Sequence, residues 1–330
     1  MIGEFELIER LAPRLSPGSS RVPIGHGDDA AVIDLGGSQA CLAVDAIVEG
    51  RHFSWGLSTP ADVGWKALAV NVSDIAAMGA EPVAAVIALG RPGGFDPDDV
   101  EALYDGMAAA ARHWSVDLVG GDTVHTEQLV VALTLLGRVD ADRAVRRSGA
   151  RPGEAVVCVG PLGAAAAGLQ LALAGHDAPA ALLGAHRRPP ARIAAGRVLA
   201  DGGVTAMIDV SDGLGADLGH LARASGVTVR VDASALPVAD GVLDAAARLG
   251  DDPWGLVCGG GEDFALVATA PPELAAGLVA TAGAAEGVAA AVIGDVRPPE
   301  PAPAVELDVD GEVRDLAWLG YDHYAEEESP

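Results

Sequence analysis

The chain has 330 residues, half of them hydrophobic, so it is too long for one ordinary core and two well-buried domains are expected. Its formal net charge of −26 argues against nucleic acid and anionic membranes as partners, because both require a basic face. The three cysteines are widely spaced, which predicts a protein without disulfides or a zinc site. The sequence starts without a basic or apolar leader and has no apolar run of about 18 residues, so we expect a cytoplasmic protein without a spanning helix.

Hydrophobic spacing in the first half predicts a helix over 4–11, strands over 30–35 and 40–48, a helix over 62–78, a strand over 83–89, a helix over 97–113, and strands over 116–119 and 129–139. The helix over 62–78 is expected to stop at Gly79 and Pro82. The next helix begins with Asp96-Pro97, a capping residue followed by proline at the first turn.

A basic, glycine-bearing stretch at 143–153 predicts a boundary, which we place between a domain 1–145 and a domain 146–330. The second domain is expected to contain a strand over 155–160, helices over 163–174 and 190–199, a strand over 206–210, a helix over 214–224, and strands over 227–231, 265–269, 291–295 and 305–309. No repeat of 20–50 residues is visible in the sequence.

Short acidic motifs, most of them beside glycine or at an expected element end, are spread over most of the chain. They are Gly27-Asp28-Asp29, Asp45, Asn71-Val72-Ser73-Asp74, Gly120-Gly121-Asp122, Asp209-Val210-Ser211-Asp212-Gly213 and Gly260-Gly261-Glu262-Asp263. Two carboxylates about 5 Å apart repel by about 3 kcal/mol at an effective dielectric near 20, so a cleft that gathers them needs cations. Hard oxygen ligands without a Cys/His cluster indicate Mg²⁺, which usually bridges substrate phosphates.

Two motifs lie in apolar surroundings, where charge is costly. Asp45 interrupts an apolar strand, and a metal ion or an arginine is the usual partner of such a carboxylate. Asn71 and Asp74 are three residues apart and share one face of the expected helix. That pair is also compatible with a purely structural polar contact.

The other motifs have plainer interpretations as well. Asp28-Asp29 and Gly120-Gly121-Asp122 are each compatible with a solvated turn, and the glycines near Glu262 with a flexible hairpin. Ser211 or Asp212 is compatible with a helix cap, whereas Asp209 is not. The pair Arg146-Arg147 suits phosphate oxygens or an ordinary surface, and a lone histidine such as His52 is most often structural.

The usual nucleotide-binding loops are missing. The sequence contains neither Gly-x-x-x-x-Gly-Lys-[Ser/Thr] nor a Gly-x-Gly-x-x-Gly fingerprint after a strand, and its only lysine, Lys66, lies in the middle of an expected helix. Any nucleotide is therefore expected to be held by metal ions, backbone amides and arginine. These observations favour a metal-dependent phosphate enzyme.

With these residues in hand, the chain resembles the thiamine-monophosphate kinase family of the aminoimidazole-ribonucleotide-synthetase-like superfamily over nearly its full length. The matching segments are Gly27-Asp28-Asp29-Ala30, Val48 to Phe53, Lys66 to Ala80, Gly120 to Thr123, Arg147 to Ala150, Asp209 to Leu214, Gly260 to Asp263, and Trp318 to His323. The acidic motifs are common to the superfamily, whereas the helix around Asn71 and the final Trp-x-Gly-Tyr-Asp-His are more particular to this kinase family.

The resemblance implies an α+β protein of two domains, with the N-terminal domain 1–145 pairing in a homodimer and the C-terminal domain 146–330 forming an α/β sandwich. It implies the reaction ATP + thiamine monophosphate → ADP + thiamine diphosphate, assisted by several Mg²⁺ ions. No covalent nucleophile is expected, because phosphoryl transfer requires mainly positioning and charge neutralisation.

The resemblance also implies residue roles, in three groups. The expected metal ligands are Asp29, Asp45, Asp74, Asp122, Asp209 and Asp212. The expected contacts to ATP are Tyr104, Gly121, Asp122, Arg147 and Ser211. The expected contacts to thiamine monophosphate are His52, Glu262 and Trp318, of which Trp318 would stack on the cationic ring.

One departure from the family pattern concerns the residues before Asp45. The family commonly has a hydroxyl residue there, but this chain has Ala43-Val44, which removes hydroxyl ligation and affects one metal site. Two alternatives remain open: another ATP-dependent enzyme of the superfamily, acting on an amide, a carbamoyl group or selenide, and a non-catalytic acidic protein that binds Mg²⁺ or Ca²⁺. The selenide alternative would require a reactive Cys or Lys before Cys41, and there is none.

Overall fold

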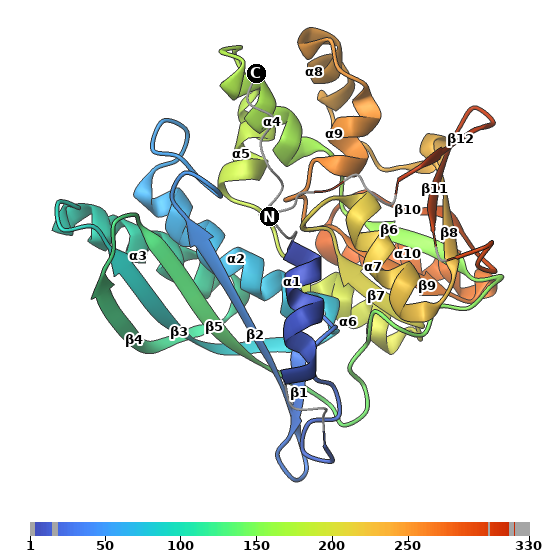
Figure 1. Ribbon diagram of the computed structural model, residues 1–330, viewed down its shortest axis with the longest axis horizontal. Helices are drawn as coiled ribbons and strands as arrows, with labels where there is room; N and C mark the ends of the chain where they lie inside the picture. The colour runs from blue at the N-terminus through green and yellow to red at the C-terminus, as the bar shows by residue number, and fades with distance from the viewer. Residues whose placement is uncertain (1–3, 15–18, 303, 317–319, 321–330) are drawn as a thin grey trace.

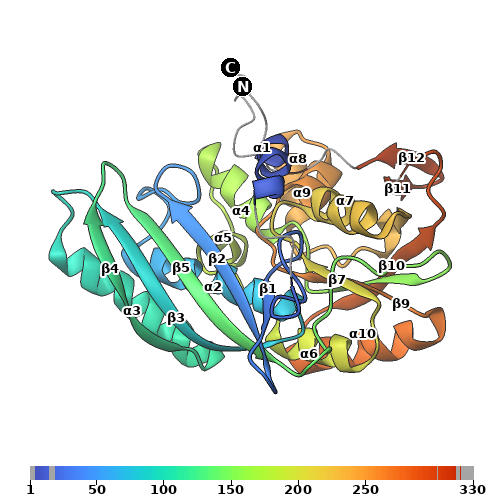
Figure 2. The same cartoon turned by 60° about the horizontal axis from the view of Figure 1, so that its bottom comes forward.

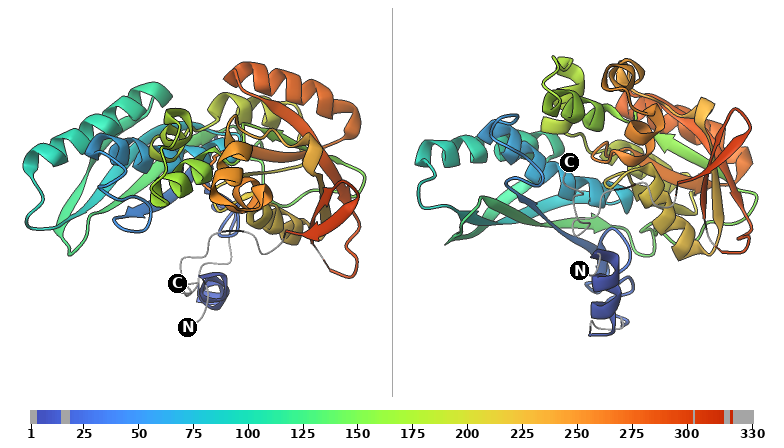
Figure 3. Two further views of the ribbon diagram at one scale, coloured as in Figure 1. Left: turned by 90° about the horizontal axis from the view of Figure 1, so that it is seen from above. Right: turned by 45° about the horizontal axis from the view of Figure 1, so that its top comes forward.

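The computed structural model describes residues 4–14, 19–302, 304–316 and 320. Two lobes lie side by side, each built on one β-sheet (Figures 1 and 3). The N-lobe contains the five-stranded sheet and the C-lobe the seven-stranded sheet, which is the α+β architecture that the family resemblance implies. Among the described helices, none combines the length and the apolar composition needed to cross a bilayer.

The N-lobe sheet has the strand order β1-β2-β5-β3-β4. Its elements are α1 (Glu4–Leu11), η1 (Ala12–Arg14), β1 (Ala31–Asp34), β2 (Gln39–Val48), α2 (Pro60–Ala77), β3 (Glu81–Arg91), α3 (Pro97–Trp114), β4 (Asp117–His125) and β5 (Val130–Val139). Helices α2 and α3 pack on one face, where alternate residues of β5 such as Leu133 and Leu135 are fully buried. Figure 2 shows the other face of β2, β5, β3 and β4, over which none of the described helices packs.

The centre of that uncovered face is apolar. Leu42 is paired with Leu136 across β2 and β5, and Val44 and Val86 flank Thr134 in the next row. The two leucines are 37% and 39% exposed, and the two valines 66% and 45%. An antiparallel sheet commonly has one face against the core and one face in solvent, and the side chains on the solvent face are usually polar. A row of exposed aliphatic side chains instead marks a surface that another protein surface can cover.

The C-lobe sheet has the strand order β12-β11-β8-β10-β6-β9-β7. Its elements are β6 (Ala155–Val159), α4 (Ala164–Leu173), α5 (Ala180–Arg187), α6 (Ile193–Asp201), β7 (Ala206–Asp209), α7 (Leu214–Ser225), β8 (Thr228–Asp232), η2 (Ala233–Ala235), α8 (Val242–Leu249), α9 (Pro253–Gly259), β9 (Leu266–Ala270), α10 (Pro272–Glu286), β10 (Ala290–Arg297), β11 (Val305–Val309) and β12 (Glu312–Asp315). The predicted domain boundary at residue 145 falls between β5 and β6.

Both faces of the C-lobe sheet are covered, so its central strands are apolar throughout. In β6, Val156 and Cys158 face a core that includes α4, α7, α8 and α9, whereas Val157 and Val159 face a second core that includes α6 and α10. A strand buried on both faces is expected to be a continuous apolar run, as this one is.

Helix α2 connects the two lobes. Its C-terminal residues Ala76 and Ala77 belong to the second core of the C-lobe, while its earlier residues Leu68 and Val72 belong to the core of the N-lobe. Helix α6 approaches α2 closely at Gly196, where an added Cβ would lie 2.1 Å from the carbonyl oxygen of Ala76. The C-terminal end of α2, just after Ser73 and Asp74, is therefore held directly against the C-lobe.

One structural expectation was wrong. Residues 120–122 were expected to form a turn after a strand over 116–119, but β4 runs without interruption from Asp117 to His125. Its register with β3 shifts between Ala85 and Val86, as in a bulge. Glycine serves close strand pairing here, because a Cβ on Gly121 would lie 1.9 Å from the carbonyl oxygen of Ile87.

Candidate active site

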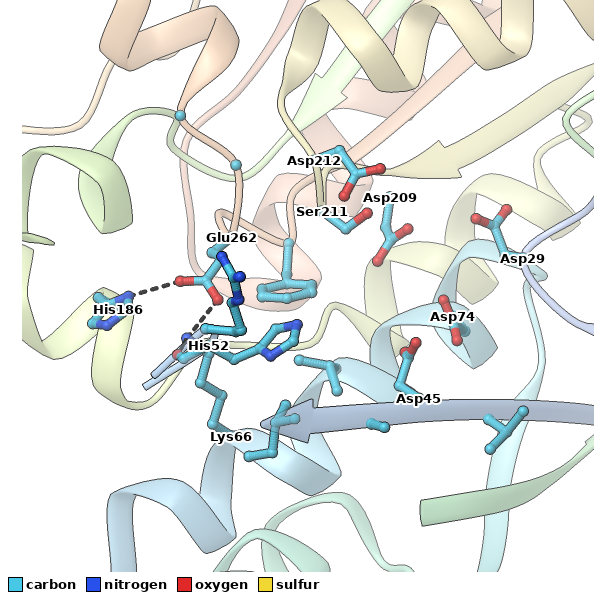
Figure 4. A pocket seen from close by; sticks show the side chains of 18 of the residues that line it. Asp29, Asp45, His52, Lys66, Asp74, His186, Asp209, Ser211, Asp212 and Glu262 are labelled. Carbon is cyan, nitrogen blue, oxygen red and sulfur yellow. Dashed lines mark hydrogen bonds and ion pairs between the residues drawn. The ribbon is translucent and has the colours of Figure 1, made fainter. Parts of the chain in front are cut away.

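A pocket of about 410 Å³ lies between the two lobes. Figure 4 shows that its labelled carboxylates come from both sides and point into one space. Its lining includes these residues expected from the sequence to be functional: Asp29, Asp45, His52, Asp74, Arg147, Asp209, Ser211, Asp212 and Glu262. The structure thus brings together residues that are up to 233 positions apart, from 29 to 262.

Three carboxylates form the acidic cluster: Asp29, Asp74 and Asp209. Each residue contributes one carboxylate oxygen, and these three oxygens all lie within 4.8 Å of one another. Asp29 precedes β1, Asp74 lies on α2 and Asp209 ends β7, so the cluster forms only where the lobes meet. The spacing of the oxygen atoms suits ligands of a shared cation.

Among the described residues, the positive charge around the acidic cluster is too small to balance its carboxylates. Burial, together with the charge of Asp29, raises the pKa of Asp209 to about 7. Burial and the charges of Asp45, Asp209 and Asp29 raise the pKa of Asp74 well above its ordinary value. Burial also raises the pKa of Asp29, although Arg147 lies beside it. Carboxylates at such distances stay ionised together only when further positive charge is supplied.

Arg147 provides part of that charge. Its Nη2 donates to Oδ1 of Asp29 at 2.7 Å, and its Nε donates to the same oxygen at 3.2 Å. The other oxygen, Oδ2 of Asp29, is buried and has no hydrogen-bond partner among the described residues. Because an orphaned carboxylate oxygen is costly inside a protein, this atom indicates a missing ligand, and the all-oxygen donor set fits Mg²⁺.

Neighbouring side chains hold the acidic residues in place. Oγ of Ser73 donates to Oδ2 of Asp209 at 2.5 Å, which joins α2 to β7. The amide of Asn71 accepts from the backbone N–H of Asp45 at 3.0 Å and donates to the carbonyl oxygen of Ala67 at 3.0 Å. Asn71 is fully buried, so the structural interpretation holds for Asn71, while Asp74 on the same helix faces the pocket.

The segment 209–213 lines the pocket through Ser211 and Asp212. Neither side chain caps α7, whose N-cap residue is Gly213 without a side-chain cap. Instead, Oδ2 of Asp217, in the first turn of α7, accepts the backbone N–H groups of Asp212 and Gly213 at 3.1 Å each. Asp217 was not singled out in the sequence, because a carboxylate in a first helical turn is common.

The other end of the pocket has a different composition. Glu262 lies between Nζ of Lys66, at 2.5 Å, and Nδ1 of His186, at 2.7 Å (Figure 4). Burial alone would raise the pKa of Glu262, but the charge of Lys66 and the hydrogen bond from His186 hold it at about 2. His52 also lines this end, and its Nδ1 accepts from the backbone N–H of Val48 at 3.0 Å, which leaves Nε2 to carry the proton of the neutral ring.

Some expected site residues are not in this pocket. Among the described residues, Tyr104, Gly121 and Asp122 do not line it. Asp122 is exposed on the edge strand β4, in the row that runs through Ala88 and Ala132 to Ala46. Three strand-to-strand steps of about 4.8 Å separate it from β2, roughly 14 Å in all. Trp318 lies outside the described residues.

The comparisons with known proteins agree with this architecture. Residues 27–139 match the family "AIR synthase related protein, N-terminal domain", and residues 151–302 match "AIR synthase related protein, C-terminal domain". The chain is 44% identical to a protein of Mycobacterium tuberculosis named thiamine-monophosphate kinase, over 81% of this chain and 80% of that protein. It is 38% identical to the protein of the same name from Salmonella typhimurium, over 98% of both chains.

A solved structure described as "AaThiL complexed with AMPPCP and TMP" superimposes with a TM-score of 0.83 at 31% identity, covering 98% of this chain and 97% of the other. The similarity in sequence and the similarity in fold to these proteins therefore both extend over nearly the whole length of the chain. The chain belongs to the thiamine-monophosphate kinase family of the AIR synthase related proteins.

Proposed function

We propose that this protein transfers the γ-phosphoryl group of ATP to thiamine monophosphate, giving ADP and thiamine diphosphate. An oxygen of the substrate phosphate forms the new bond to the γ-phosphorus, and the bond from that phosphorus to the β,γ-bridging oxygen breaks. The orphaned Oδ2 of Asp29 within the acidic cluster is the observation that carries the proposal, because it favours a cation where two phosphate groups must meet. The related structure with AMPPCP and TMP supports ATP and thiamine monophosphate as the two substrates.

Asp29, Asp74 and Asp209 are the residues that would hold Mg²⁺, with Asp45 and Asp212 beside them in the same pocket. When bound, Mg²⁺ ions neutralise phosphate oxygens and charge that develops on the leaving group. The side chains themselves need only bind and orient, so we propose an in-line displacement without a covalent intermediate. Arg147 and Ser211 are proposed to contact the ATP phosphates from the C-lobe side of the pocket.

The thiamine portion is proposed to bind at the end of the pocket that contains Glu262 and His52. Glu262 is ionised and 26% exposed, which suits an amine donor or the positive ring of the substrate. This arrangement leaves the substrate phosphate directed toward the acidic cluster. Trp318, outside the described residues, keeps its predicted stacking role.

We also propose that the working enzyme is a homodimer in which the uncovered faces of two N-lobe sheets pack together. A second copy of the chain is a suitable occupant, because the centre of the face is apolar and the face is continuous with the pocket through Val44. A partner subunit would also bring a second β4 to the site, and with it the expected ligand Asp122. This proposal accounts for an expected ligand that lies roughly 14 Å from β2 within one chain.

A coupled assay tests the reaction. Purified protein with ATP, Mg²⁺ and thiamine monophosphate is expected to form one ADP and one thiamine diphosphate per turnover. ATP turnover without thiamine monophosphate, supported by another acceptor, would favour a different enzyme of the superfamily. Metal binding without any turnover would favour the non-catalytic alternative.

The dimer has a separate test. Leu136→Asp places a charge in the uncovered face and is expected to give monomers by light scattering, with loss of most of the kinase activity, because burying an unpaired charge is strongly unfavourable. Leu243→Asp is the matched control, since Leu243 is 54% exposed on α8 of the C-lobe. A wild-type protein that is monomeric and fully active would contradict the dimer proposal.

A further inference from the structure

The carboxylate of Glu262 receives one donor from each lobe. Lys66 lies on α2 of the N-lobe, and His186 lies in the last turn of α5 in the C-lobe. The ammonium group contacts Oε1 and the imidazole contacts Oε2, so each oxygen has its own partner. Because an ionised carboxylate only accepts hydrogen bonds, Nδ1 of His186 must carry the proton that is shared.

Both partners are themselves buried and held. The Lys66 side chain is 2% exposed, and its Nζ also donates to the carbonyl oxygen of His52 at 2.8 Å. The His186 side chain is 5% exposed. A lysine buried to this degree is rare without a partner, and here it is the only lysine of the chain. Its position thus depends on Glu262 and on the backbone of a residue at the substrate end of the pocket.

The backbone of Glu262 is also held in an unfavourable conformation. Its φ is +59°, in the left-handed region that non-glycine residues seldom adopt. Its N–H donates to the carbonyl oxygen of Ser211 at 2.7 Å, and the next residue, Asp263, accepts the N–H of Gly163 at 2.6 Å. Strain of this kind persists where surrounding contacts fix it, and it is concentrated at functional sites.

Stability alone is a weak reason for this arrangement. A buried ion pair contributes little net stability, because desolvation of the two charges offsets their attraction. Glu262 nevertheless keeps 26% of its side chain exposed to the pocket. Each carboxylate oxygen has two acceptor sites, so after binding Lys66 and His186 the group can accept two further bonds from a ligand.

We propose that Lys66 and His186 are positioning residues, which fix the Glu262 carboxylate across the lobe interface so that its free acceptor sites meet the cationic heteroaromatic part of the substrate. This inference rests on the proposed function, since it identifies the ligand as thiamine monophosphate. Neither residue touches the substrate. Both act on substrate affinity through Glu262, and neither acts on ATP.

The test compares binding and turnover of Lys66→Met, Glu262→Gln and the double variant with wild type. Lys66→Met is expected to raise the KM for thiamine monophosphate about tenfold, which corresponds to about 1.4 kcal/mol, while the KM for ATP and kcat stay within about twofold. In the Glu262→Gln background, Lys66→Met is expected to add no further increase, because the residue it acts through is already changed. Full additivity of the two changes would overturn the proposal.

His186 provides a second test that does not depend on the folding of the lysine variant. His186→Leu removes the donor and is expected to raise the KM for thiamine monophosphate, whereas His186→Asn keeps an N–H at the position of Nδ1 and is expected to restore it. Equal effects of Leu and Asn would contradict a positioning role. Arg230→Met is the matched control, because Arg230 forms a half-buried ion pair with Asp308 far along the C-lobe sheet.

Calorimetric binding of thiamine monophosphate to the same variants separates this inference from the proposed function. If the wild-type protein binds the compound but does not phosphorylate it, the proposed function fails, and the affinities of the variants still test Lys66 and His186. If the wild-type protein phosphorylates it and Lys66→Met binds and turns over normally, only the present inference fails.

Discussion

The two ends of the pocket use the same functional group in opposite electrostatic states. At one end, Asp29, Asp74 and Asp209 lie around Arg147, which is paired with Asp29, and burial raises the pKa of Asp209 to about 7. At the other end, Glu262 has Lys66 and His186 as partners, and these hold its pKa at about 2 against the effect of burial. Counting only the part of the chain that the structure describes, the first group lacks compensating positive charge, whereas the second has it.

This difference indicates different tasks. A cluster of carboxylates without enough positive charge can bind metal ions, which supply that charge and also bind the substrate phosphates. A carboxylate whose two oxygens each have a partner is instead fixed in orientation and in charge, which suits recognition of one part of a substrate. Changes at the acidic end are therefore expected to reduce turnover, and changes at the Glu262 end to reduce substrate affinity.

The largest expected effect is that of Asp209→Asn. Loss of this ligand is expected to lower kcat at least about 10²-fold, because charge stabilisation of the transition state is usually the largest catalytic contribution. The thermal midpoint without metal is expected to stay the same or rise, since the change relieves repulsion within the cluster. Steady-state kinetics and a melting curve measure both. A wild-type kcat would break the proposed division of tasks between the two ends.

The pH dependence of stability sharpens the comparison. Asp209 has a pKa of about 7 in the folded chain against an ordinary value of 3.8, so between these values the folded chain binds more protons than the unfolded one. The contribution of Asp209 to the free energy of unfolding of the metal-free protein therefore falls as the pH rises from about 4 to about 7, by up to about 1.4 kcal/mol per pH unit. Asp209→Asn is expected to flatten that slope, and saturating Mg²⁺ to remove it.

Glu262 is expected to behave in the opposite way. Its folded pKa of about 2 lies below the ordinary 4.5, so its contribution to stability is present above pH 4.5 and is lost as the pH falls toward 2. Denaturant titrations of wild type and Glu262→Gln at several pH values test this. A variant that loses as much stability as wild type in that acid range would contradict the charge state assigned to Glu262.

The smallest expected effect is that of Ser73→Ala. This change removes the hydrogen bond to Asp209 that crosses from α2 to β7, and a bond to a charged group is worth about 1.5–3 kcal/mol. Because the Ser73 hydroxyl lowers the pKa of Asp209, its loss is expected to move the acid limb of kcat to higher pH as well as to lower kcat about tenfold. An unchanged pH profile would show that Ser73 does not act through Asp209.

The sequence predicted the acidic end better than the Glu262 end, for physical reasons. The carboxylates of the cluster were visible because glycine neighbours and apolar surroundings leave few structural explanations for charge. Nothing in the sequence near Lys66 or His186 identifies their shared partner Glu262, which is 196 and 76 positions away, respectively. A single lysine within an apolar helix was the one available sign, and it was interpreted only as the absence of a phosphate-binding loop.

The fold was also predictable only in part. Most strands followed from apolar runs, but the segment around Gly121 was assigned to a turn, although its glycines serve close pairing of β4 with β3. Helix α10 was not predicted, because alanine and glycine occur on all its sides and leave a weak apolar periodicity. The role of Asn71 as a link between α2 and β2 depends on tertiary contact and could not follow from spacing alone.

The most direct test of the account is the location of a bound cation. Crystals of the protein grown with Mn²⁺ in place of Mg²⁺, together with a non-hydrolysable ATP analogue, would reveal the metal through its anomalous scattering. We expect at least one peak about 2.1 Å from oxygen atoms of Asp29, Asp74 and Asp209, including Oδ2 of Asp29. Well-occupied nucleotide with no metal peak at these three carboxylates would contradict it.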